Sequence, residues 1–184
     1  MANVQLDIEY TAQRDRLSSA LRVIYAIPHL IIVGVLGDVA GVLAVVQWFI
    51  ILFTGKRNLG LWNLSRNILG WQVRVSAYVG LMYDVYPNFG FEKNLEPVTF
   101  GLEFEESANR LTCALRMIWA IPAVIVLMLV GIAGFAVTIV CWFAIVATGT
   151  QSRGMFDFLL KVHRYGARTS AYTYLLTDTY PKYE

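Results

Sequence analysis

Two long stretches of the chain, residues 23–55 and 117–149, are almost entirely apolar. Each is 33 residues long, and all fifteen Lys and Arg residues lie outside both. The first stretch contains one acidic residue, Asp38, and the second contains no Asp, Glu, Lys or Arg. A helix that crosses a bilayer needs about 20 apolar residues. The pattern therefore predicts that both stretches are helices within a membrane.

Shorter patterned segments flank each apolar stretch. Apolar residues alternate with polar ones over 4–10 and again over 98–104, which is typical of a half-buried strand. The two strands are predicted to pair with each other. After each apolar stretch, over 60–83 and 154–177, apolar residues recur at helical spacing with cationic residues between them.

The same order of segments occurs twice because the chain is an internal repeat. A shift of 94 residues aligns 4–90 with 98–184 without a gap, and 28 of the 87 aligned positions are identical. We therefore expect repeat 1 over 1–90, a polar linker over 91–97 and repeat 2 over 98–184.

Each apolar stretch has two interpretations, a single helix or a hairpin. A single straight helix would be about 50 Å long, more than the hydrocarbon core of about 30 Å, and would place basic residues on both sides of the bilayer. A hairpin that turns at Gly37, Asp38 and Gly131 keeps every basic residue on one side. The hairpin is the favoured interpretation, and a re-entrant hairpin that does not cross fully remains an alternative.

The predicted fold class is mainly α and integral to the membrane, with two tandem parallel repeats. Each repeat has a short β-strand, a transmembrane helical hairpin and an interfacial amphipathic helix. The hairpins are expected over about 15–55 and 109–149, and the amphipathic helices over about 60–83 and 154–177. The two repeats would share one orientation, about a pseudo-two-fold axis along the membrane normal.

The cationic face of each amphipathic helix suggests contact with anionic lipid headgroups. An equally supported alternative is that this face is simply the solvated side of a helix packed on its own hairpin. The candidate headgroup ligands are the basic residues of these helices and one arginine at the start of each apolar stretch: Arg66, Arg74, Lys161, Arg164, Arg168, Arg22 and Arg116.

Composition supports the membrane class and offers little chemistry. The chain is 57% hydrophobic and 15% charged, compared with roughly 25% charged in ordinary soluble domains. His29 and His163 have no partners at metal-ligand spacing, and no phosphate-binding glycine loop or nucleophile–base set is present in the sequence. We expect no catalytic, cofactor or metal site and no nucleic-acid partner.

Four motifs resemble a known family. They are Ala26-Ile-Pro-His29, the Trp48–Gly55 segment, Arg74-Val-Ser-Ala-Tyr78 and Tyr86-Pro-Asn-Phe89. In this order they are similar to a bacterial, mainly actinobacterial, family of membrane proteins of unknown function in which tandem copies of the unit occur. The resemblance implies a bacterial source and a membrane location, and it implies no mechanism.

The sequence therefore predicts a non-enzymatic membrane scaffold or accessory subunit. Its partners would be membrane lipids and other membrane proteins, or a second copy of the chain. Its location would be the bacterial cytoplasmic membrane, multi-pass, with both termini in the cytoplasm. A small oligomeric channel or transporter and a membrane-shaping hairpin protein are the alternatives.

Overall fold

The computed structural model describes residues 4–92 and 96–184. Copy one contains strand β1 (Gln5–Ile8), helix α1 (Arg16–Thr54) and helix α2 (Leu59–Val79). Copy two contains β2 (Val98–Gly101), the short α3 (Arg110–Ala114), α4 (Arg116–Thr148) and α5 (Arg153–Thr173). Of the predicted linker 91–97, residues 93–95 lie outside the described part of the chain.

The predicted hairpins are wrong, because each apolar stretch forms one uninterrupted helix. α1 has 39 residues and runs straight through the expected turn at Gly37 and Asp38, and α4 has 33 residues and contains Gly131. A turn there would need backbone outside the helical region, whereas the glycines with positive φ among the described residues are Gly55, Gly90 and Gly149. A glycine inside a helix costs only about 1 kcal/mol relative to Ala, so Gly37 and Gly131 do not have to break one.

Both long helices begin and end on the same local signals. Asp15 is the N-cap of α1, and Asn109 is the N-cap of α3, which leads into α4. α1 and α4 end at Gly55 (φ 72°) and Gly149 (φ 75°), in the left-handed conformation that glycine adopts without steric cost.

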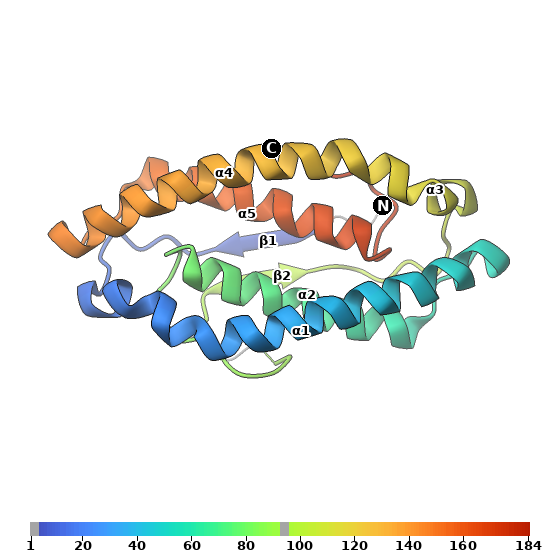
Figure 1. Cartoon of the computed structure of the whole chain (residues 1–184), viewed down its shortest axis with the longest axis horizontal. Helices are drawn as coiled ribbons and strands as arrows, with labels where there is room; N and C mark the ends of the chain where they lie inside the picture. Colours follow the sequence, from blue (N-terminus) through green and yellow to red (C-terminus); the bar gives the residue numbers. More distant parts are fainter. Residues whose placement is uncertain (1–3, 93–95) are drawn as a thin grey trace.

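The predicted pairing of the two strands is confirmed. β1 and β2 form an antiparallel two-stranded ribbon in which Leu6 lies opposite Phe100 and Gln5 lies opposite Gly101. Because Leu6 and Phe100 are equivalent positions of the two copies, the pseudo-two-fold axis passes through this pair. A half-turn in the plane of Figure 1 accordingly exchanges α1 with α4 and α2 with α5.

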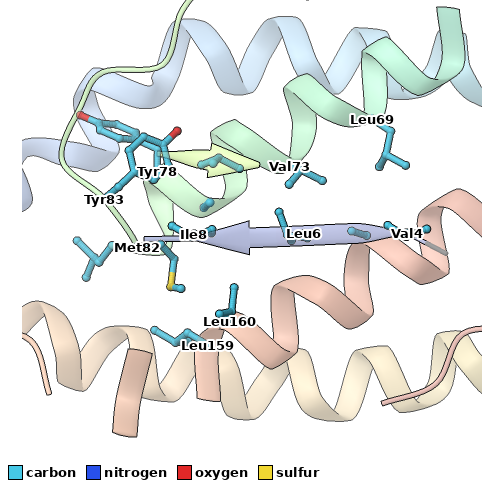
Figure 2. Packing of buried hydrophobic residues seen from close by; sticks show 14 of the residues in the cluster. Val4, Leu6, Ile8, Leu69, Val73, Tyr78, Met82, Tyr83, Leu159 and Leu160 are labelled. Atoms are coloured by element: carbon cyan, nitrogen blue, oxygen red, sulfur yellow. The ribbon is translucent and has the colours of Figure 1, made fainter. Parts of the chain in front are cut away.

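The elements form three layers along this axis. The strand ribbon contacts α2 and α5, α2 contacts α5, and α1 and α4 pack on α2 and α5 respectively and on each other. The main core lies between the ribbon and the α2/α5 layer, where Leu6, Ile8, Val73, Met82 and Leu159 meet (Figure 2). α2 and α5 therefore lie between the ribbon and the long helix of their own repeat. This agrees with the alternative interpretation of the sequence, in which each amphipathic helix packs on the apolar segment of its own repeat.

The axis makes α1 and α4 antiparallel and ties their ends together. Trp142 Nε1 donates to the Ser19 carbonyl (3.1 Å), and Trp48 Nε1 donates to the Cys113 carbonyl (2.8 Å). The two contacts are equivalent, since Trp48 and Trp142 occupy the same position of the repeat. The long helices thus run in opposite directions along the longest dimension of the molecule (Figure 1).

We predict that Trp48→Phe and Trp142→Phe each lower the free energy of unfolding by about 1–3 kcal/mol, since each change leaves a helix carbonyl without its donor at the contact between copies. Urea unfolding in a mild detergent measures the effect. Phe53→Leu, at an exposed position of α1, is the control and should change stability by less than about 0.5 kcal/mol. Wild-type midpoints for both tryptophan variants would contradict the assignment.

Candidate membrane interface

α1 and α4 expose most of the large hydrophobic side chains of the described residues. Met117 is 81% exposed, Phe53 75% and Phe135 68%, and similar residues follow one another along both helices. By length and composition both helices are apolar enough to cross a membrane, yet only 11% of the most apolar 18-residue window of each is buried inside the protein. An exposed apolar patch that extends along two helices on a protein surface marks an interaction site.

Only a narrow stripe of each long helix is buried. On α1 the stripe includes Arg22, Ala26, His29, Gln47 and Ile51, spaced to lie on the face that packs on the rest of the protein. α4 buries equivalent positions. The remaining circumference of both helices has no protein to cover it.

The predicted turn residue Asp38 lies on the exposed side of α1. It follows Gly34 and precedes Val42 by one helical turn each, and all three are exposed. The equivalent residue of α4, Ile132, is 67% exposed. Asp38 is therefore a single carboxyl group on an otherwise apolar face.

The outer face of strand β1 is polar. Alternate residues of β1 point away from the core, and the outward ones, Gln5 and Asp7, are exposed. Arg164 of α5 pairs with the carboxylate of Asp7 at 3.0 Å and donates to the Leu6 carbonyl at 2.8 Å. The strand ribbon lies at the middle of the long dimension, on the pseudo-two-fold axis (Figure 1).

Charges also gather at both ends of the long helices. Lys56, directly after α1, pairs with Glu106 at 2.8 Å, and Arg153, at the start of α5 and close after α4, pairs with Asp157 at 2.9 Å. Since α1 and α4 are antiparallel, both ends of the molecule carry basic residues.

Three of the predicted headgroup ligands are buried and bind groups of the protein instead. Arg22 is 1% exposed, pairs with Asp84 and donates to the Tyr83 carbonyl at 2.7 Å. Arg116 repeats this arrangement with Asp178 and the Thr177 carbonyl. Their guanidinium groups also lie over aromatic rings, 4.7 Å from Tyr78 for Arg22 and 4.0 Å from Tyr172 for Arg116.

Arg74 is the third buried residue among the predicted headgroup ligands. It is 6% exposed and donates to the Gly90 carbonyl at 2.6 Å. The other predicted ligands are more accessible. Lys161 is exposed and Arg66 half-buried. Arg168 is half-buried and donates to the Lys182 carbonyl, while Arg164 binds the strand ribbon as described above.

Two further buried arginines, which the sequence patterns did not single out, join the copies. Arg14 donates to Gln151 at 3.0 Å and to the Met82 carbonyl at 2.7 Å. Arg57 donates to the Leu175 carbonyl at 2.9 Å and pairs with Asp178 at 2.7 Å. Arg14 lies two residues before α1 and Arg57 two residues before α2, but the carbonyls that they bind follow the ends of α2 and α5, so no local pattern in the sequence identifies this role.

Asp178 thus accepts from arginines of both copies. Burial on its own would raise the pKa of Asp178, but the Asn109 N–H bond and the charges of Arg57 and Arg116 outweigh it and hold this pKa below its ordinary value. Desolvation lowers the pKa of Arg14 and of Arg74, and burial strongly raises the pKa of Tyr83.

The two histidines have structural contacts. His29 is fully buried, with Nδ1 accepting from Trp71 Nε1 at 3.2 Å and Nε2 facing the Pro87 carbonyl at 3.1 Å. His163 Nδ1 faces the Leu159 carbonyl at 2.8 Å. Across residues 4–92 and 96–184 the structure contains no group of three or more His, Cys, Asp and Glu side chains placed to hold a metal ion.

A cavity of about 550 Å³ lies where α1, α2, α4 and α5 meet. α1 and α4 form its walls through Val23, Leu30 and Ile139, and Leu159 and Val162 of α5 form part of its floor. Its pseudo-symmetric counterpart at the other end of α1, beside Trp48, has about 260 Å³.

Both copies match one family profile, described as a domain of unknown function (DUF4389), over residues 16–91 and 110–183. The chain belongs to this family. It contains two tandem DUF4389 domains, which agrees with the internal repeat. No curated protein and no solved structure matches the chain. The DUF4389 matches begin at the first residues of α1 and of the short α3, and each includes the Arg–Asp pair of its copy, so these ion pairs lie within the family unit.

We predict that Asp178→Asn destabilises the protein by several kcal/mol, near the lower end of the about 3–5 kcal/mol for breaking a buried pair, since Asp178 is 25% exposed and Arg57 is fully buried. Denaturant unfolding at neutral pH measures the loss. Asp157→Asn, which breaks the exposed pair with Arg153, is the control at about 0.5 kcal/mol or less.

The lowered pKa of Asp178 also sets a pH dependence. A carboxyl whose pKa is lower in the folded state stabilises the fold above its unfolded pKa of about 3.9 and loses this contribution as the pH falls through the folded value. We therefore expect stability to fall on acidification below about pH 5, with a shallower fall in Asp178→Asn. Parallel pH profiles of the two proteins would argue against this role.

Proposed function

We propose that the protein is a non-enzymatic membrane scaffold or accessory subunit whose long helices lie in the plane of the membrane. The observation that carries this proposal is the segregation of the surface, with large apolar side chains exposed along α1 and α4 and the polar residues Gln5 and Asp7 exposed on the strand ribbon. Helices with one apolar side of this kind insert into the boundary between headgroups and acyl chains.

An in-plane orientation fits the fold better than a spanning one. At 1.5 Å per residue α1 is about 58 Å long, nearly twice the hydrocarbon thickness of about 30 Å. If α1 and α4 stood upright, the strand ribbon with its exposed Asp7 would lie near the bilayer centre, where a carboxylate costs about 3 kcal/mol or more. Lying flat, the protein keeps this ribbon in water.

The same orientation accounts for the basic residues at both ends of α1 and α4. In an upright protein these residues would face both sides of the membrane, against the positive-inside tendency. In a flat protein Lys56 and Arg153 both lie at the headgroup level of one leaflet.

On this basis the pseudo-two-fold axis is the membrane normal, and the strand ribbon faces the cytoplasm together with both termini. The membrane is the cytoplasmic membrane of a bacterium. The exposed residues of the ribbon and Lys161 form the surface offered to other membrane proteins or to a second copy of this chain. A stoichiometric foreign protein co-purifying with the chain would identify the process that it serves.

Membrane shaping is the second candidate, favoured by one observation. All the long apolar helices lie on one face of the molecule, so insertion expands one leaflet and not the other. A channel or transporter is a weaker candidate, because the outer faces of α1 and α4 have few polar groups in the described structure besides Asp38 and the terminal threonines. Ion flux through reconstituted vesicles that depends on Asp38 would reverse this order.

We predict that Arg16→Cys and Lys56→Cys, at opposite ends of α1, react equally with a membrane-impermeant maleimide added outside sealed vesicles containing protein of one orientation. An upright helix would expose only one of them, because its ends would lie on opposite sides. Native Cys113 and Cys141 are buried, and the wild-type reaction gives the background to subtract. One-sided labelling would refute the in-plane orientation.

We predict that Asp38→Ile, which introduces the residue that repeat 2 has at Ile132, strengthens partition into vesicles several-fold without changing the fold. A carboxyl on the apolar face is costly to place in the bilayer when α1 inserts, and the substitution removes this cost. Vesicle flotation and circular dichroism measure the two effects. Ile132→Asp should weaken partition by a similar factor, and unchanged partition of both variants would exclude this face from the bilayer.

A further inference from the structure

A second, smaller pocket lies between α2, β2 and the segment that follows α2, away from the long apolar helices. It has a volume of about 230 Å³. Four residues of α2 line it, Arg66, Asn67, Gly70 and Arg74, and the other walls are apolar. Two guanidinium groups and one side-chain amide therefore meet around a single hollow.

Arg74 presents one of its nitrogen atoms to this pocket. Its Nη2 donates to the Gly90 carbonyl, and its Nε is buried and faces the Glu96 carboxylate at 3.8 Å. Nη1 has no hydrogen-bond partner among residues 4–92 and 96–184, and unlike Nε it is not sealed from solvent. A Cβ added to Gly70, which lines the pocket, would lie 4.0 Å from this Nη1. The missing side chain of Gly70 thus opens the space in front of Arg74.

Arg66 and Asn67 supply the other donors. Arg66 lies two helical turns before Arg74, so the two side chains share one face of α2. It is half-buried, and no acidic side chain of the described residues pairs with it. Its Nη1 donates to Asn67 Oδ1 at 3.4 Å, which leaves the Asn67 amide nitrogen as a free donor. Because Glu96 faces Arg74 only, the pocket has one positive charge without a counter-charge.

The number of donors and the charge select the ligand. Three side chains with free N–H groups match an anion with at least three acceptor oxygens, as a phosphate group has, whereas a carboxylate has two. Guanidinium groups bind phosphate through two parallel hydrogen bonds. A volume below the 300–1,000 Å³ of ordinary small-molecule sites is suited to one such group rather than to a whole nucleotide.

We propose that this pocket binds one phosphate group, carried by inorganic phosphate or a soluble phosphate monoester, or by a phospholipid headgroup. Arg66 and Arg74 Nη1 are its charged donors and Asn67 its neutral one. Binding here does not require α1 and α4 to lie in a membrane, so the pocket and the membrane association are tested separately.

Repeat 2 has lost this pocket, which makes the expected stoichiometry one phosphate per chain. Arg164 stands at the position of Gly70, and its side chain fills the equivalent space by binding the Leu6 carbonyl and Asp7 of the strand ribbon. Leu160 stands at the position of Arg66 and is buried in the core.

The repeat supplies matched variants. Arg66→Leu introduces the residue of repeat 2 and removes one charged donor, and Asn67→Asp places a carboxylate in the pocket. Arg66→Lys keeps the charge but not the planar pair of donors. The control is Lys161→Asn, which removes one positive charge at an exposed position and introduces the residue of repeat 1. Circular dichroism and urea midpoints establish that each variant is folded.

The measurement is calorimetric titration of inorganic phosphate into protein held in a detergent without phosphate, preceded by native mass spectrometry to detect retained phospholipid. We expect one phosphate per wild-type chain and binding within twofold of this for Lys161→Asn. Arg66→Leu and Asn67→Asp should bind at least tenfold more weakly, as loss of one charge-assisted hydrogen bond implies, with Arg66→Lys between.

Mass spectrometry separates the sources of the phosphate group. Lipid-free protein that binds inorganic phosphate identifies a soluble ligand. A phospholipid retained by the wild type and lost from Arg66→Leu, and displaced by inorganic phosphate, identifies a headgroup.

Three results would overturn the proposal. They are wild-type protein that binds neither inorganic phosphate nor phospholipid, folded Arg66→Leu that binds as the wild type does, and acetate that displaces phosphate at equal concentration. Vesicle flotation of the same variants reports on membrane association independently, because no side chain of α1 or α4 lines this pocket.

Discussion

Each long helix is held at its end by the other copy, and the rest of the structure depends on this exchange. The Gly55 carbonyl at the end of α1 accepts from Ala108 N–H at 2.9 Å, and the Gly149 carbonyl at the end of α4 accepts from Arg14 N–H at 2.8 Å. The last carbonyls of a helix otherwise lack partners within it. Because each copy completes the other, the tandem arrangement is a structural requirement of this fold rather than a repetition of independent domains.

The exchange also determines which faces remain open. With their ends fixed antiparallel about the axis, α1 and α4 cannot bury each other along their middles, and the cavity opens between them. α2 and α5 then close one side of the long helices, and the strand ribbon covers α2 and α5 in turn. The apolar sides of α1 and α4 are left for another medium, which makes an apolar outer surface a consequence of the packing.

Much of the secondary structure could be predicted from the sequence, because it depends on local periodicity. The alternation around Leu6 and Phe100 indicates the strands, and the repeat itself implies that the equivalent strands are able to pair. The helical spacing over 60–83 and 154–177 locates α2 and α5 to within a few residues at each end. Their packing was left open by the sequence, since an amphipathic helix has the same pattern beside a lipid headgroup as beside a strand.

The hairpins were predicted wrongly for a physical reason. The length of each apolar stretch and the charges at both of its ends argue against a helix that crosses the bilayer, and a turn at Gly37 resolves both objections. A helix lying flat resolves them equally well without any turn, and nothing in the local sequence distinguishes the two. Tertiary contacts distinguish them, because Gln72 of α2 donates to the Val33 carbonyl, one turn before Gly37, and holds the middle of α1 against α2.

The buried arginines were also only partly visible in the sequence. Arg22 and its equivalent Arg116 are identical in the two copies, as are Asp84 and Asp178, which agrees with an ion pair that the common unit needs. Lys161, by contrast, corresponds to an asparagine in the other copy, as a solvated position allows. Identity between copies therefore marks the arginines of the two Arg–Asp pairs. It does not mark Arg14 and Arg57, which join the copies although they align with Ala108 and Gln151.

Sequence differences between the copies accompany a difference between the two cavities. Repeat 2 has Gly134 where repeat 1 has Ala40, and His163, where repeat 1 has Leu69, reaches the Ser76 carbonyl of the first copy at 3.2 Å. Both Gly134 and His163 line the larger cavity, and neither has an equivalent in the smaller one. The common unit alone would give two equal cavities about the axis, so the larger volume of this one comes from residues that only one copy has.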